Sequence, residues 1–74
     1  MSMTSRAARV RAAIDADLHR AGRPVTVDGM PTARQAAAST HELHVILQRM
    51  VRAGLLLRIG RGYHNGDPYK YHRA

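Results

Sequence analysis

The segment from Ser39 to Gly54 constrains the fold of this chain more than any other part of the sequence. Ser39 and Glu42 have the spacing of a capping box, in which the serine hydroxyl accepts from the Glu42 amide and the Glu42 side chain returns to the Ser39 amide. Gly54 is the expected end, because glycine tolerates the left-handed conformation that closes a helix. The apolar residues between them recur at helical spacing as one stripe, consisting of Leu43, Ile46, Leu47 and Met50. The sequence therefore predicts an amphipathic helix with one buried face.

A first helix is predicted from the N-terminal part of the chain to Gly22. Thr4 or Ser5 can cap its start, and Pro24 blocks continuation beyond Gly22. Spacings of three and four residues again define a single apolar stripe, formed by Ala7, Val10, Ile14, Leu18 and Ala21.

The segment between these two helices predicts a short strand and a short helix. The β-forming residues from Pro24 to Val27 are too few for an independent strand, and we expect one edge strand of a larger sheet. Pro31 suits a first helical position, and Thr32 with Gln35 can form a capping box, so a helix is predicted over Pro31–Ala37. This helix offers only alanines as apolar residues, with Met30 just before it.

The C-terminal part predicts a β-hairpin, with strands at Leu55–Ile59 and Tyr69–His72. Turn-forming residues fill the interval from Gly60 to Pro68, and Gly60-Arg61-Gly62 suggests a flexible tip. The three tyrosines, Tyr63, Tyr69 and Tyr71, are interpreted mainly as packing residues, because a chain without Phe or Trp needs these rings in its core. Stacking on unpaired bases is the alternative.

Charge narrows the class of partner. The 74 residues carry twelve Lys and Arg against five acids, a formal charge of +7, which attracts polyanions. Residues 43–74 hold six of these cations and one acid, Asp67, a surplus of +5. No apolar run approaches the roughly 20 residues of a membrane span, so we expect no membrane partner. The absence of cysteine permits a reducing compartment, and we expect a cytoplasmic protein with a single domain over 1–74, loose at about 1–4 and 73–74.

The run from Ser39 to Leu56, together with the basic strand, the Gly-Arg-Gly sequence and the tyrosine-bearing return strand, resembles the second half of a winged helix-turn-helix domain of bacterial regulators. The resemblance covers about residues 25–72. It implies an α+β fold in which three helices are joined to a wing of two or three strands. It also implies that the helix at about 39–54 is the recognition helix and that residues 55–72 form a basic wing.

The resemblance further implies sequence-specific binding of double-stranded DNA by a small transcriptional regulator or by a phage or recombination accessory factor. In the recognition helix, the implied contact residues are Thr40, His41, His44, Val45, Gln48, Arg49 and Arg52. In the wing, the implied contacts to phosphate or the minor groove come from Arg58, Arg61, His64 and Lys70. Physical chemistry fits these assignments, because arginine can pair with guanine and glutamine with adenine through two hydrogen bonds.

The histidines suggest a metal site only weakly. His41 and His44 stand three apart, whereas the zinc-protease motif needs two histidines four apart, and position 45 is Val. A site shared with His64 or His72 is the remaining option, and no third ligand or supporting residue can be named. We expect no metal, no cofactor and no small-molecule ligand.

Catalysis is not expected either. Asp15 and Asp17 lie two apart on the first helix and point to different faces, and no Ser/His/Asp set is evident. The alternatives to duplex DNA binding are a protein interaction module on the same fold and an RNA or single-stranded nucleic-acid binder. A homodimer on adjacent half-sites, with the first helix as its surface, or a regulatory protein partner is also expected.

Overall fold

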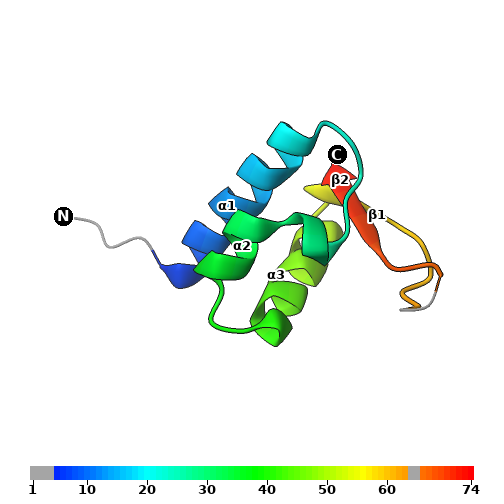
Figure 1. Ribbon diagram of the computed structural model, residues 1–74. Helices are drawn as coiled ribbons and strands as arrows, with labels where there is room; N and C mark the ends of the chain where they lie inside the picture. The colour runs from blue at the N-terminus through cyan, green and yellow to red at the C-terminus, as the bar shows by residue number, and fades with distance from the viewer. Residues whose placement is uncertain (1–4, 64–65) are drawn as a thin grey trace.

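A computed structural model describes residues 5–63 and 66–74 of the chain. Within these ranges, three α-helices precede a two-stranded antiparallel hairpin. The elements are α1 (Arg6–Ala21), the 3₁₀ turn η1 (Val27–Gly29), α2 (Pro31–Ala36), α3 (Thr40–Arg52), β1 (Leu56–Ile59) and β2 (Lys70–Arg73). Figure 1 shows the helices packed together and the loop end of the hairpin projecting away from them. The predicted α+β class, with three helices and a two-stranded antiparallel sheet, is confirmed for the described residues.

Helix α1 begins and ends where the sequence predicts. The Ser5 hydroxyl accepts from the Ala8 amide at 3.1 Å, and Gly22 adopts the left-handed conformation with φ of 63° while its amide donates to the Leu18 carbonyl. The predicted stripe is buried at Val10, Ile14 and Leu18, and only partly buried at its alanine ends.

The end of α3 is a complete Schellman motif. Gly54 has φ of 77°, and its amide donates to the Val51 carbonyl at 3.1 Å. The next amide, that of Leu55, donates to the Met50 carbonyl at 2.9 Å, so carbonyls left unpaired by the end of the helix are satisfied. At the other end, the Ser39 hydroxyl accepts from the Glu42 amide at 3.1 Å, as predicted.

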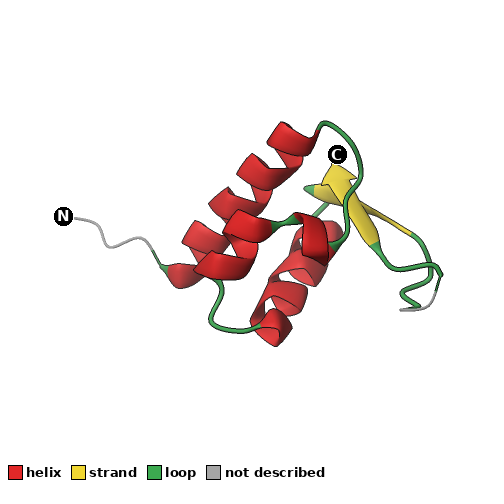
Figure 2. Cartoon of the chain, viewed as in Figure 1, coloured by secondary structure: helices red, strands yellow, loops and turns green. Residues whose placement is uncertain are grey.

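The hairpin lies beside the helices (Figure 2), and one apolar core joins them. The whole predicted stripe of α3 is buried, and both strands contribute to the same cluster through Leu56 and Tyr71. Met30 and Ala33 are fully buried, so a methionine just before α2 supplies the bulk that the alanines of this helix lack. Tyr71 and the half-buried Tyr69 bear out the packing interpretation, whereas Tyr63 is 62% exposed.

The capping box predicted for α2 is wrong. Met30 occupies the N-cap position without a side-chain cap, because its thioether is at best a weak acceptor and is buried in the core, and the helix ends at Ala36 rather than Ala37. The Ala33 amide instead donates to the buried carboxylate of Asp17 on α1 at 2.9 Å. Asp17 also forms an ion pair with Arg20, so α1 supplies the acceptor that α2 does not provide for itself.

The strand predicted at Pro24–Val27 is reduced to a single bridge. The Val25 amide and carbonyl both bond to Tyr71, at 3.0 and 2.8 Å, which adds one residue to the free side of β2. The chain cannot stay extended beyond this point, because it turns through η1 to reach α2 and the carbonyls of Thr26 and Val27 bond to amides three residues ahead.

The hairpin is shifted and its tip is more constrained than predicted. β1 begins at Leu56, since the Leu55 amide closes α3, and β2 extends to Arg73, so the prediction of a loose end at 73–74 is wrong for Arg73. Gly60 and Gly62 have positive φ, and a Cβ atom on either would lie 2.6 Å from Pro68 or the Tyr69 ring, respectively. These glycines therefore permit close approach of the returning chain, and flexibility does not account for them.

We expect Asp17→Ala to lower the free energy of unfolding by about 1 to 3 kcal/mol, because the buried Ala33 amide loses its acceptor. Asp15→Ala is the matched control: Asp15 is exposed and pairs with Arg73 at 3.1 Å, and such surface pairs are worth about 0 to 1 kcal/mol. Urea titrations of both variants measure the difference. Equal losses in the two variants would contradict the role assigned to Asp17.

Candidate nucleic-acid interface

The predicted contact residues of α3 lie on its side away from the core and on its two flanks, with Thr40 on the α2 flank and Arg49 on the α1 flank. His41, Gln48 and Arg52 are exposed on the side opposite the buried stripe, as their spacing along the helix requires. Thr40, His44 and Arg49 are also exposed, while Val45 is half-buried. The structure thus brings all seven predicted residues of this helix onto its accessible surface.

The ion pairs of the described residues leave the cations of this surface without carboxylate partners, as they also leave Arg11 of α1 and Arg23. Four arginines from the other elements and the C-terminal strand pair with carboxylates, in the pairs Arg6–Glu42, Arg20–Asp17, Arg34–Asp28 and Arg73–Asp15. Among the described residues, no carboxylate forms an ion pair with Arg49, Arg52, Arg61 or Lys70. The unneutralised cations therefore include the two arginines of α3 and two cations of the hairpin.

The predicted hairpin residues do not lie on one face. Arg58 is opposite Tyr71 in the strand register and Lys70 is opposite Ile59, so their side chains project from opposite faces of the two-stranded sheet. The Arg58 guanidinium lies 4.3 Å from the centroid of the Tyr69 ring, a cation–π contact that partly commits it to the hairpin itself. Burial raises the pKa of Tyr71, and the neighbouring Arg58 partly opposes this shift.

Arg61 has a fixed backbone position near the tip. Its amide donates to the Asp67 carboxylate at 3.2 Å, and the Asp67 carbonyl accepts from the amides of Gly62 and Tyr63 at 3.0 and 2.9 Å. Asp67 therefore closes the base of the loop by accepting from three backbone amides with its carboxylate and its carbonyl, and Arg61 remains exposed. The fourth predicted hairpin residue, His64, lies outside the described residues.

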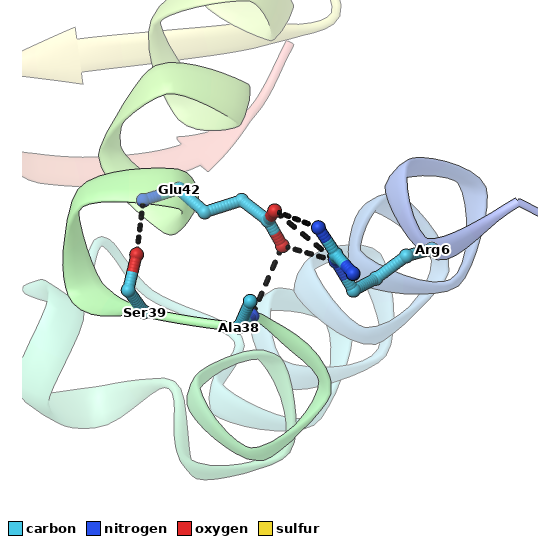
Figure 3. A network of polar contacts seen from close by, with 4 residues as sticks. All are labelled: Arg6, Ala38, Ser39 and Glu42. Atoms are coloured by element: carbon cyan, nitrogen blue, oxygen red, sulfur yellow. Dashed lines mark hydrogen bonds and ion pairs between the residues drawn. The ribbon is translucent and has the colours of Figure 1, made fainter.

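A network at the start of α3 joins three elements (Figure 3). The Glu42 carboxylate accepts from Arg6 of α1 in a two-pronged contact, with nitrogen–oxygen distances of 2.7 and 2.9 Å. It also accepts from the Ala38 amide at 3.0 Å. The predicted return of Glu42 to the Ser39 amide is therefore wrong, since the carboxylate reaches one residue further back and is shared with α1. The hydrogen bonds from Arg6, and then the one from Ala38, lower the pKa of Glu42.

A hollow of about 340 Å³ lies beside this network and connects α1 to the exposed side of α3. Arg6, His41, Val45 and Arg49 contribute to its lining. Arg6 was missed by the sequence analysis, because nothing in its local pattern shows that α1 passes the start of α3 at this point. Within the described ranges, no three His, Asp or Glu side chains gather as a metal-ligand set.

Comparison with known proteins gives no match: no family model, no curated protein and no solved structure is significantly similar to this chain. In the part of the chain that the structure describes, no helix combines the length and apolar character needed to cross a bilayer.

We expect Glu42→Gln to lower the melting temperature at pH 7, because the ion pair with Arg6 is lost. The pKa of Glu42 is lowered in the folded protein, so its stabilising contribution is present above the ordinary glutamate value of about 4.3 and is lost as pH falls through the lowered value. The two melting temperatures should therefore converge in acid. Differential scanning calorimetry between pH 3 and 7 measures this convergence.

Asp28→Asn is the control for this experiment, since Asp28 is 92% exposed at its side chain and lies 3.8 Å from Arg34. It should leave the melting temperature nearly unchanged. A Glu42→Gln variant with the same melting temperature as the parent protein at pH 7 would show that the network does not stabilise the fold.

Proposed function

We propose that the protein binds duplex DNA in the manner of a winged helix-turn-helix domain, with α3 in the major groove and the hairpin against the backbone or the minor groove. The order of elements supports this proposal. A three-residue turn over residues 37–39 separates α2 from α3, and the hairpin follows α3 directly. The Val25 bridge to β2 stands where a third strand would complete the wing sheet.

The observation that carries the proposal is the set of cations left without carboxylate partners on α3 and the hairpin. Electrostatic attraction to phosphates dominates the affinity of DNA-binding proteins, so an unneutralised basic face is what such binding needs. Arg49 and Arg52 have the length and chemistry to read guanine, and Gln48 to read adenine, from an exposed helix that the major groove can accommodate. Arg61 and Lys70 supply backbone contacts.

Arg58 contributes less to DNA binding than its position in the basic wing predicts, because its guanidinium lies over the Tyr69 ring. Arg6 lines the same hollow as Arg49, but its charge is paired with Glu42, so its part is to hold the start of α3 against α1. The biological role that fits such a module is that of a small transcriptional regulator or an accessory factor of phage or recombination complexes.

A salt titration tests the class of nucleic acid. The affinity for duplex DNA should fall steeply with salt. A plot of the logarithm of the binding constant against the logarithm of the salt concentration should have a slope of about −0.9 for each phosphate contact. Fluorescence anisotropy with duplex DNA, single-stranded DNA and duplex RNA of matched length compares the three substrates. Tighter binding to RNA or to single strands would support the alternative nucleic-acid function. Failure of every duplex to bind better than micromolar at moderate salt would overturn the proposal.

We expect Arg49→Ala and Arg61→Ala to weaken DNA binding in different ways. Arg49→Ala should cost about 1 to 3 kcal/mol on a preferred site selected from random sequences and should flatten discrimination between sites. Arg61→Ala should weaken binding to all sequences similarly and reduce the salt slope by about one. Arg11→Ala removes the same charge from an exposed position of α1 and serves as the control. Identical effects of the first two variants would contradict the division between reading and anchoring.

A further inference from the structure

The outer face of β1 and the residue before it carry an exposed apolar stripe. Leu55, Leu57 and Ile59 are 57%, 51% and 49% exposed, respectively. Leu57 and Ile59 project from the same face of β1, and Leu55 precedes the strand with its carbonyl bonded to the Ala74 amide at 3.3 Å, which continues the alternation by one residue. Single exposed apolar residues are ordinary, whereas three aligned side chains in a small protein indicate an interaction surface.

The same segment has an open backbone edge. β2 pairs with β1 on one side and with Val25 on the other, so β1 is the outer strand, and no strand of the described residues runs along its far side. The Tyr71 amide and carbonyl bond to Val25 and therefore point away from β1. Arg58 is opposite Tyr71, and in an antiparallel pair its amide and carbonyl therefore point away from β2, toward the open edge. Because the direction alternates along a strand, the amide and carbonyl of Leu56 point toward the open edge as well.

We propose that a second copy of this chain pairs along this edge, antiparallel to the first, with the two-fold axis at Leu57. In this register Leu56 of each copy faces Arg58 of the other, and both residues present free amides and carbonyls to form the ladder. Leu57 of one copy faces Leu57 of the other, and Leu55 of each copy faces Ile59 of the other. Every exposed apolar side chain of the stripe thus meets another one on the same face.

Charge selects this register over its neighbours. A two-fold axis at Arg58 would set the two guanidinium groups directly opposite each other, and like charges in that position destabilise a strand pair. An axis at Leu56 would place Ile59 opposite residue 53 on the helix turn, whereas in the proposed register it meets Leu55, whose carbonyl still bonds to the Ala74 amide next to β1. α1, the dimer surface expected from the sequence, is a weaker candidate, because its described exposed residues include four arginines and no large apolar side chain.

The size of the surface sets the strength of the association. A stable interface buries at least about 1,200 Å² in total, which three half-exposed side chains on each copy do not reach. Each copy also carries a charge of +7, so the copies repel each other at a distance. The pairing should therefore be weak at low salt and should strengthen as salt screens this repulsion.

Disulfide trapping tests the register directly, because the chain contains no cysteine and each variant then has a single thiol. In the proposed pairing, position 57 faces itself in a pair without mutual hydrogen bonds, where Cα atoms lie about 4.5 Å apart, a separation that a disulfide spans. Leu57→Cys, oxidised at high protein concentration, should form on the order of tenfold more covalent dimer than Tyr63→Cys, an exposed thiol outside the strand pair.

Two further variants distinguish pairing from random collision. Leu55→Cys and Ile59→Cys should each cross-link poorly alone, because each faces the other position, but their mixture should yield the covalent heterodimer. The yield from Leu57→Cys should rise with salt. Equal cross-linking of all single variants, or a mixture no better than its components, would overturn the proposal. No DNA is present in this experiment, so its outcome is independent of the proposed function, and thermal melts of each variant verify that the fold is retained.

Discussion

The buried carboxylate of Asp17 is the interaction on which the placement of α2, and through it of α3, depends. α2 has six residues, no side-chain cap of its own and no large apolar residue within it. Isolated helices of this length do not form in water. It is held by a hydrogen bond from its Ala33 amide to α1 and by Met30 in the core just before its first residue. The turn into α3 starts from this anchored helix, so the direction of α3 is set from α1.

A second polar contact completes this arrangement at the other end of the turn. Glu42 bonds to Arg6 and to the Ala38 amide, so the carboxylate that starts α3 is also a contact between α1 and α3. Two acids thus have structural tasks in positioning the helices. The consequence for the surface is that most carboxylates are engaged with arginines away from the outer side of α3, where Arg49 and Arg52 keep their charge.

Features governed by short-range sequence were predictable. The beginning and end of α1 and α3 follow from Ser5, Gly22, Ser39 and Gly54, whose conformational preferences act within a few residues. The buried stripes follow from helical periodicity, and the exposed residues of α3 follow by exclusion. The predictions failed where a distant element changed the outcome. Asp17 replaced the expected cap of α2, and η1 shortened the expected strand to Val25, because the chain had to turn toward α2.

The candidate nucleic-acid interface also combines features that the local sequence predicts with features that depend on distant elements. Exposure of the α3 residues could be read from the sequence, but the commitment of Arg58 to the Tyr69 ring depends on the register of the hairpin. The position of Arg6 depends on how α1 packs against α3. Neither has a signal in the local pattern. The close approach of the chain at Gly60 and Gly62 likewise becomes visible only when the returning strand is in place.

The Schellman motif at Gly54 also links the mechanics of the helix and the hairpin. The Leu55 amide that closes α3 belongs to the residue immediately before β1, so there is no spacer in which a rotation of one could be absorbed without moving the other. Helix and hairpin should therefore move as one rigid unit, which keeps the outer side chains of α3 at a fixed orientation relative to Arg61 and Lys70.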